Sequence, residues 1–373
     1  METFKSSATI EGTAVTALPR VNGGPISGGR AMATGLALVC CGLAILYGLS
    51  SFYGIDAIRD KIFAFTASNL SKVMTQGPLL ATVAGCLMVE AFLVGYEKSS
   101  LKRLLNPSKS AQSDLYLFVF RVTGILAFLD AAVTLGASEW FPMIARRLFS
   151  FDILSFVGNP WVKFAIIYLA LDFAKYWSHR VGHMWKWCWE GHKLHHAATE
   201  MNMITASRAH PLDDAIGLLI VGIPAAILGS SGLAPIAFFV TLNVVLSMLH
   251  HSGIGWSWGW LGKYVICSPR YHQIHHSVHR DHVDKNYCGM LIIWDWVFGT
   301  RYDGPVEPTE FGCAENQYNR EGLLHDLMEG TRRVYGELGD AVRRGCRLLS
   351  RRNRHGGNES SLVPAGPDLG VRG

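Results

Sequence analysis

Long apolar runs separated by short polar stretches fill much of the first 250 residues. An α-helix needs roughly 17 to 25 mostly apolar residues to cross the hydrocarbon layer of a membrane. Four runs approach that pattern and predict membrane-spanning helices: residues 31–54, 78–95, 115–136 and 160–177. An apolar hairpin over residues 214–250, interrupted at residues 229–232, either crosses twice or enters and returns. The pattern predicts an all-α fold, a multi-pass transmembrane helical bundle.

The two ends of the chain have different patterns. Residues 1–30 and 351–373 lack apolar periodicity, so we expect both to be disordered tails. Residues 318–350 carry apolar side chains at helical spacing, punctuated by arginines. Such a basic amphipathic helix is expected either to lie on an anionic membrane surface or to pack against the rest of the protein.

Composition agrees with a membrane-embedded chain. Of its 373 residues, 49% are hydrophobic and only 17% are charged, whereas soluble domains carry about 25% charged residues. The formal net charge of +5 does not indicate nucleic-acid binding, because the basic residues lie in loops and near the C-terminus. The eight cysteines contain no C-x-x-C pair, which argues against a disulfide framework and against a cysteine zinc site.

The basic residues also predict an orientation. Lys98, Lys102, Arg103 and Lys109 lie between the second and third predicted spans, and the positive-inside rule places such a loop in the cytosol. Counted from there, the fourth span and the hairpin both return to the cytosolic side. The segments that follow them are therefore expected to form a helical cap facing the cytosol.

Those segments are rich in histidine, since eleven of the fifteen histidines lie between His179 and His276. Residues three or four apart share one face of a helix, so H-x-x-x-H and H-x-x-H-H spacings bring imidazoles together. Eight histidines follow these spacings: His179 and His183; His192, His195 and His196; His272, His275 and His276. Because burying them without a common partner would be costly, the pattern predicts a metal centre with a histidine-rich helical cap.

Separate segments supply further candidates. His210 and His251 are plausible additional ligands, each brought in by its own segment. Asp172, two turns before His179, is expected either to orient a ligand through a hydrogen bond or to pair with Lys175. We assign no ligand role to the other histidines: His250, His279, His282, His325 and His355.

The identity of the metal stays open at this point. Imidazole suits zinc, copper, iron and nickel alike, whereas structural zinc usually takes four ligands that include cysteine. The histidines suffice for two ions. Two other functions remain as alternatives: a membrane zinc-dependent hydrolase, although no H-E-x-x-H motif is present, and a non-catalytic metal-binding membrane protein.

The order and spacing of these motifs resemble the fatty acid hydroxylase / sterol desaturase superfamily of integral membrane enzymes. The match runs from Asp172 to Thr300 and includes Y-W-S-H-R, H-K-L-H-H, R-A-H-P, H-S-G, Y-H-Q-I-H-H, D-K-N-Y and W-D-W-V-F-G-T. The resemblance implies hydroxylation or desaturation of an aliphatic C–H bond in a sterol or fatty-acyl lipid. It also implies two Fe ions (Zn in a purified form), O2, and electrons from NAD(P)H through a ferredoxin or a b-type cytochrome with its reductase.

The resemblance carries roles onto particular residues. Metal-ligand roles pass to His179, His183, His192, His195, His196, His210, His251, His272, His275 and His276. Asp172, Asn286 and Tyr287 are expected to support the ligands from behind. The chain then divides into a tail (1–30), transmembrane helices of unassigned role (31–160), a catalytic domain (161–305), a C-terminal segment with the basic helix (306–350) and a second tail (351–373). We expect it in a bacterial inner membrane or the endoplasmic reticulum.

Overall fold

Helices form the regular structure of this protein. The computed structural model describes residues 76–134, 153–228, 233–305, 310–313 and 316–356, together with residues 136, 144, 147 and 148. Apart from helices, these residues contain only two isolated antiparallel bridges, Ile266 with Leu291 and Ser277 with Phe311. The predicted all-α class is confirmed. The predicted first span (31–54) and the predicted N-terminal tail lie outside the described residues.

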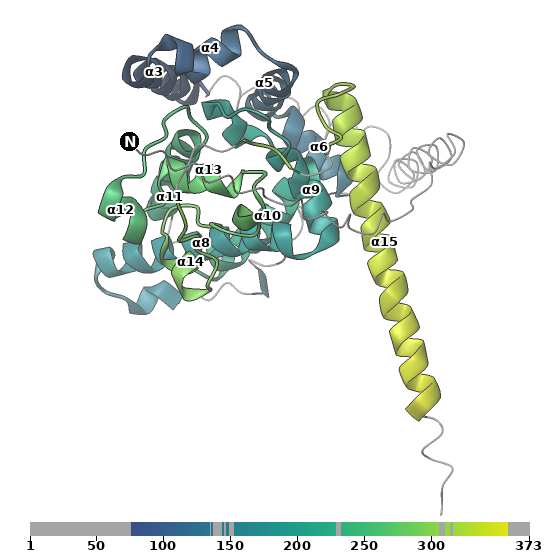
Figure 1. Cartoon of the computed structure of the whole chain (residues 1–373). Coiled ribbons are helices and arrows are strands. Elements are labelled where there is room, and N and C mark those ends of the chain that lie inside the picture. The colour runs from purple at the N-terminus through teal and green to yellow at the C-terminus, as the bar shows by residue number, and fades with distance from the viewer. Residues whose placement is uncertain are drawn as a thin grey trace, which may run out of the picture. The chain divides into compact units, whose positions relative to one another are not determined.

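The α-helices follow one another through the chain as Figure 1 shows. Their bounds are α3 (Gly77–Val94), α4 (Ser100–Leu105), α5 (Lys109–Val122), α6 (Ile125–Val133), α8 (Pro160–Met184), α9 (Lys186–His196), α10 (Pro211–Ile227), α11 (Leu233–His250), α12 (Gly259–Tyr264), α13 (Pro269–His275), α14 (Ile293–Val297) and α15 (Leu323–Gly356). Short 3-10 turns lie at Tyr96–Lys98, Ile153–Phe156, Met203–Ser207 and Arg280–His282.

Helix α8 begins and ends at clear local signals. The side chain of Asn159 accepts hydrogen bonds from the backbone N–H groups of Trp161 and Val162, and Pro160 occupies the first turn, where its missing N–H costs nothing. The helix ends at Met184, because Trp185 is extended and turns the chain directly into α9. This turn places the histidines at the end of α8 beside those of α9.

Two apolar cores hold these helices in place. Ile167 and Leu171 of α8 pack with Phe239 of α11 and with Met290, all of them buried. On the other side, Leu194 of α9 packs with Leu323 and Leu327 of α15 and with Leu117 of α5. Helices α10 and α11 also both lie against α8. The histidine-bearing helices are therefore fixed by apolar packing on both sides.

The third predicted span is broken. Helix α5 stops at Val122 and α6 starts at Ile125, with an 88° bend between them. Gly124 allows the break, because its φ of 79° lies in the left-handed region that glycine adopts without strain. The hydropathy pattern contained no signal for this bend, since the residues on both sides are apolar.

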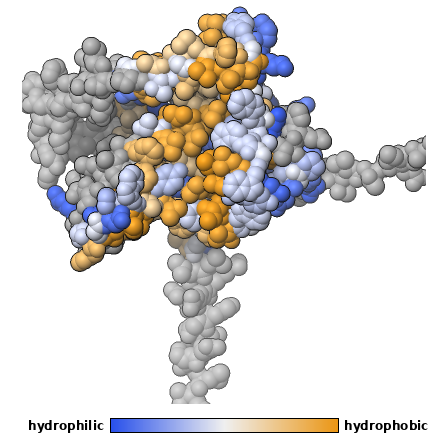
Figure 2. Space-filling model, turned by 90° about the vertical axis from the view of Figure 1, so that its left-hand side faces the viewer, coloured by the Kyte–Doolittle hydropathy of each residue, from blue (hydrophilic) through white to orange (hydrophobic). Residues whose placement is uncertain are grey.

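The length and hydropathy of a helix indicate whether it can cross a membrane. No single helix in the described residues is long and apolar enough to cross a membrane, although the bent pair α5–α6 passes the test as a unit. Many large apolar side chains are nevertheless exposed, among them Phe92 of α3, Phe156, Trp161 of α8 and Phe238 of α11. Figure 2 shows apolar residues gathered into a band across one face. A soluble monomer rarely exposes large continuous apolar surfaces.

The predicted basic helix near the C-terminus is present as α15. Its first half packs against α9 through Leu323, Leu327 and Val334, which are buried. Later apolar positions such as Val342 are exposed, and the C-terminal part of α15 extends away from the other helices in Figure 1. The helix also continues through residues 351–356, where a disordered tail was predicted; residues 357–373 lie outside the described residues.

The break at Gly124 gives a testable prediction. Replacing Gly124 by Ala should lower the free energy of unfolding by about 1–2 kcal/mol, because a side chain in the left-handed region clashes with the backbone. Gly222 of α10 is the matched control, since nothing lies within 4 Å of a Cβ placed there. Gly222→Ala should raise stability by about 0.5–1 kcal/mol. Unfolding in detergent measures both, and equal effects of the two changes would show that the bend does not depend on glycine.

Candidate metal centre

The fold brings nine histidines into two compact groups. The first histidine group contains His179, His183, His192, His196 and His275; the second contains His195, His251, His272 and His276. Within each group, one ring nitrogen of every member lies within 4.8 Å of those of the other members. Nine of the ten histidines predicted as ligands from the sequence are thus brought together, and they come from α8, α9, the end of α11 and α13.

The two H-x-x-H-H motifs contribute to the groups in opposite ways. On α9, His192 and His196 join the first group, whereas His195 joins the second. In the α13 motif, His272 and His276 join the second group and His275 joins the first. Histidines four apart share one helix face, and the third imidazole points to the neighbouring site. Each group therefore draws members from both motifs.

Backbone carbonyls fix the protonation of several imidazoles. The Nδ1 atom of His195 donates to the carbonyl of Arg208 (2.9 Å), and that of His251 donates to the carbonyl of Ser247 (2.7 Å). A carbonyl only accepts hydrogen bonds, so the proton of each neutral ring lies on Nδ1 and Nε2 carries a free lone pair. His179 and His275 are held in the same way by the carbonyls of Tyr287 (2.9 Å) and Lys285 (2.6 Å).

The bare Nε2 atoms then face one another. Those of His195 and His251 lie 3.3 Å apart, and two lone pairs at that distance repel each other unless a cation lies between them. In the first group, the Nε2 atoms of His179, His192 and His275 are buried without any partner. A buried polar atom without a partner is costly. Several convergent imidazole nitrogens are a donor set for a first-row transition metal, so the residues fit two metal ions.

Burial also keeps these rings neutral. It lowers the pKa of His275 to about 3 and that of His251 to about 4, well below the usual value of 6.5. For His179, His183 and His196, burial and the neighbouring histidines likewise lower the pKa far below that value. Because only neutral imidazole can coordinate a metal, these histidines are ready to bind at neutral pH.

One loop supports three ligands of the first group. Besides the carbonyls of Lys285 and Tyr287, it places Asp284 Oδ1 3.4 Å from His183 Nδ1. Asp284 and Asn286 have positive φ angles of 58° and 61°, a conformation that aspartate and asparagine tolerate better than most residues. The Asn286 side chain holds the loop by bonding the backbone of Tyr271 and Tyr302. Both Asn286 and Tyr287 therefore lie where the sequence predicted supporting residues.

The hydrogen-bond partners of two carboxylates near the histidines differ from those expected from the sequence. Among the described residues, no histidine is a hydrogen-bond partner of Asp172. Its carboxylate accepts from Leu291 N (3.2 Å) and from Trp294 Nε1 in α14 (2.8 Å), which ties α8 to α14 and the residues just before it. Asp213, in the first turn of α10, accepts instead from His192 Nδ1 at 2.9 Å. Sequence reasoning missed Asp213, although it closely follows the R-A-H-P motif.

His210 lies outside both groups. It caps the start of α10, where Nδ1 accepts from the backbone N–H of Leu212, and Nε2 donates to the carbonyl of Leu327 in α15 at 2.9 Å. Both nitrogens are thus used in structural bonds, one that caps α10 and one that joins α10 to α15. His250 lies near the second group, but its Nε2 donates to the carbonyl of Cys267. His279 and His282 pair with each other outside the groups.

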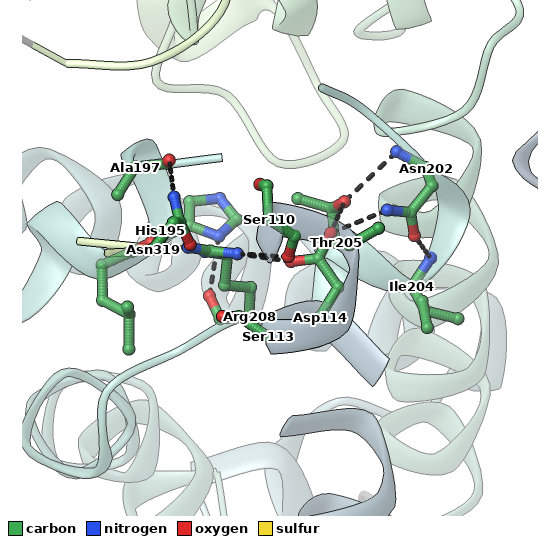
Figure 3. A network of polar contacts seen from close by, with 12 residues as sticks. Ser110, Ser113, Asp114, His195, Ala197, Asn202, Ile204, Thr205, Arg208 and Asn319 are labelled. Carbon is green, nitrogen blue, oxygen red and sulfur yellow. Dashed lines mark hydrogen bonds and ion pairs between the residues drawn. The ribbon is translucent and has the colours of Figure 1, made fainter. Parts of the chain in front are cut away.

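A buried ion pair fixes the carbonyl that orients His195 (Figure 3). The fully buried guanidinium of Arg208 bonds Asp114 at 2.9 Å and the carbonyl of Leu194 at 2.7 Å. The other oxygen of Asp114 accepts from Asn202 and Thr205, both at 2.7 Å. Removing one partner of such a pair typically costs about 3–5 kcal/mol. The network therefore anchors the 195–208 segment against α5.

A cavity of about 590 Å³ lies beside the histidines. Its walls come from α6, α8, α10 and α11, and His179, His192, His195, His251 and His272 line one part of it. Much of the remaining wall is apolar: Leu126, Leu218, Val221, Phe239, Val240 and Val244. Volumes of this order accommodate small molecules or a segment of a longer one.

Parts of the chain are similar in sequence to known proteins. Residues 164–300 match the family model described as fatty acid hydroxylase. Alkylglycerol monooxygenase of Homo sapiens is 33% identical over 158 residues, which cover 42% of this chain and 34% of the human protein. The ornithine lipid hydroxylase of Rhizobium tropici is 27% identical over 303 residues, covering 79% of this chain and 81% of that protein.

A third relative is methylsterol monooxygenase 2-2 of Arabidopsis thaliana, which is 26% identical over 193 residues, covering 50% of this chain and 65% of that protein. The chain spans about a third of the length of the alkylglycerol monooxygenases that it matches. No solved structure matches the chain.

The two histidine groups predict metal stoichiometry. The purified protein should bind two metal ions per chain, and His196→Ala or His276→Ala should each lower this to one, because each removes a ligand of a different group. His325→Ala on α15 is the control and should retain two ions. Elemental mass spectrometry measures the content. A single ion in the wild type, or full content in both ligand variants, would contradict the assignment.

The contact of Asp213 with His192 gives a second prediction. Asp213→Ala should weaken metal binding at the first group by about 10–100-fold, as loss of a group that orients a ligand usually does. Asp214→Ala is the matched control, because Asp214 pairs with Arg121 rather than with a histidine. Competition with a chelator measures both affinities, and equal losses in the two variants would mean that Asp213 does not act through His192.

Proposed function

We propose that the protein, whose residues 164–300 match the fatty acid hydroxylase family model, is a lipid hydroxylase that inserts one atom of O2 into an aliphatic C–H bond at a centre of two iron ions. The observation that carries this proposal is the pair of buried histidine groups whose bare Nε2 atoms converge beside a cavity. The relatives named above support the reaction type, since their names describe monooxygenases and hydroxylases of lipids.

Iron fits this reaction better than zinc. The overall reaction, R–H + O2 + 2 e⁻ + 2 H⁺ → R–OH + H2O, requires a metal that changes its oxidation state, and zinc has no redox chemistry. Bound iron would supply the two-electron reduction of O2. The nine histidines would hold it, five for one ion and four for the other. Removal of a second hydrogen instead of hydroxyl transfer would give desaturation, which stays open.

The residues of this chain supply position and exclusion of water. Carbonyls of Arg208, Ser247, Tyr287 and Lys285 hold the imidazoles in one orientation, so the geometry exists before substrate arrives. The apolar wall of the cavity would take the hydrocarbon part of a lipid. Burial of the histidine groups keeps bulk water away from the reacting carbon.

The electrons for this reaction would come from another protein. We propose NAD(P)H as the source, with a ferredoxin or a b-type cytochrome and its reductase as the carrier, as the family resemblance implies. The carrier would dock on the surface above the histidine cap and transfer one electron at a time.

The membrane is the expected environment. The exposed apolar side chains of α3, α8 and α11 would contact lipid tails rather than water. The predicted orientation, with the histidine groups at the cytosolic face of a bacterial inner membrane or of the endoplasmic reticulum, remains part of the proposal. A lipid would then reach the cavity directly from the bilayer.

A zinc-dependent hydrolase is less well supported. It would need a carboxylate base at the metal, and Glu190, the nearest candidate in sequence, lies 3.8 Å from Arg333 of α15. Asp213 is already bonded to His192. The hydroxylase therefore remains the better proposal.

The test compares lipids of cells that express the wild type or the His275→Ala/His276→Ala double variant, grown under 18O2. We expect a lipid with one added 18O atom in wild-type cells only, because the variant loses a ligand from each group. His325→Ala serves as the control and should give the labelled lipid. High-resolution mass spectrometry of the extracts provides the measurement.

The outcomes separate the alternatives. A lipid that loses two hydrogens without gaining 18O would replace hydroxylation by desaturation. Purified protein that contains two zinc ions and oxidises no lipid, even when iron is reconstituted and a reduced carrier is supplied, would sink the proposal.

A further inference from the structure

The cavity beside the histidines is polar where it meets them. Lys175 and Ser178 from α8, and Asn243 and Ser247 from α11, line it together with the ligand histidines. Lys175 precedes His179 by four residues, so both lie on one face of α8 about one turn (5.4 Å) apart. Asn243 and Ser247 are likewise one turn apart on α11. The four side chains therefore form a polar band next to the histidine groups.

Among the described residues, the ammonium group of Lys175 forms no direct ion pair or hydrogen bond. The carboxylates of Asp213 and Asp214, which line the same cavity, attract it from a longer distance. Each of these carboxylates has a closer partner: Asp213 bonds His192 at 2.9 Å, and Asp214 bonds Arg121 at 2.7 Å. The Lys175 side chain is accessible and reaches the cavity. A cation that lines a binding cavity without a direct ion pair is available to a ligand.

Gly289 makes room for this arrangement. A Cβ atom at Gly289 would lie 3.0 Å from Cγ of Lys175 and 3.7 Å from Nδ2 of Asn243. A side chain at Gly289 would press on the Lys175 stem, so the glycine gives the stem room beside Asn243. The position of the ammonium is thus built by α8, α11 and the segment that follows the 284–287 loop.

The polar band restricts what can lie at the histidines. The apolar part of the wall is formed by Leu218, Val221, Phe239, Val240 and other residues. A hydrocarbon chain oxidised at its middle would have to lie across Lys175 and Asn243, and covering an ammonium group and an amide with methylene groups is unfavourable. A lipid with its polar group at the band and its tail along the apolar wall satisfies both surfaces.

We propose that Lys175, with Asn243 and Ser247, binds an anionic oxygen group of the lipid head, a carboxylate or a phosphate, and so places a carbon close to the headgroup at the histidines. The oxidised C–H bond then lies within a few bonds of the head rather than in the middle of an acyl chain. This inference rests on the proposed hydroxylase function for the oxidation, but not for the binding.

Binding is tested without turnover. The iron-loaded full-length protein in maltoside micelles is titrated with dodecyl phosphate, dodecanoate and dodecanol, which share one chain length and differ in head. We expect at least one anionic probe to bind about tenfold more tightly than dodecanol, as expected for a charge-assisted contact. The stronger of the two anions identifies phosphate or carboxylate as the source.

The variants isolate the lysine. Lys175→Met should abolish the preference for the anionic probe, whereas Lys175→Arg should retain most of it because the charge remains. Lys163→Met, which removes a lysine of α8 that does not line the cavity, is the matched control and should bind like wild type. Iron content and gel-filtration profile verify folding, and Lys175→Gln replaces Lys175→Met if the latter does not fold. An anion preference that survives both neutral substitutions would overturn the proposal.

The position of oxidation gives a second readout. The labelled lipid should carry 18O near its headgroup, and Lys175→Met should raise KM at least tenfold with a smaller change in kcat. Oxidation in the middle of a chain that Lys175→Met leaves unaltered would overturn the inference while leaving the hydroxylase intact. Conversely, Lys175-dependent anion binding without any oxidised lipid would support the binding site and contradict the proposed function.

Discussion

The structure depends on where the histidine protons lie. Carbonyl oxygens behind His179, His195, His251 and His275 hold the proton of each ring on Nδ1. The Nε2 lone pairs are then forced to point inward, toward one another. Such an arrangement is repulsive in the absence of a cation and favourable in its presence. The surrounding fold must therefore hold the rings together against this repulsion before any metal binds.

Segments that are distant in the sequence hold the histidine rings in place. The 284–287 loop orients ligands of the first group, and the Arg208–Asp114 pair fixes the carbonyl behind His195 in the second. Apolar packing of α8 against α11, and of α9 against α15, holds the helices that carry the ligands. Because the two H-x-x-H-H motifs each serve both groups, the two sites share the same supporting helices.

In the proposed function, the cavity would couple the metal centre to a substrate. Its apolar wall suits a hydrocarbon tail, and the polar band with Lys175 adjoins the histidines. The reactive part of the site is thus adjacent to a charged, hydrogen-bonding surface rather than at the midpoint of an apolar tunnel. A lipid would match both surfaces in one direction of binding only, with its tail on the apolar wall and its head at the polar band. In that direction, the proposed oxidation would occur near the lipid head.

The sequence by itself determined the helical class and which histidines could converge, because residues four apart on a helix must share a face whatever the tertiary structure. The supporting roles expected for Asn286 and Tyr287 came from the family resemblance and not from helical spacing. The tertiary structure alone decided how the nine histidines divide between two groups, that Asp213 rather than Asp172 bonds a ligand, and that His210 caps α10 instead of joining them. It also decided the bend at Gly124. These features depend on which segments meet in space, and neither periodicity nor local spacing encodes contacts between distant parts of a chain.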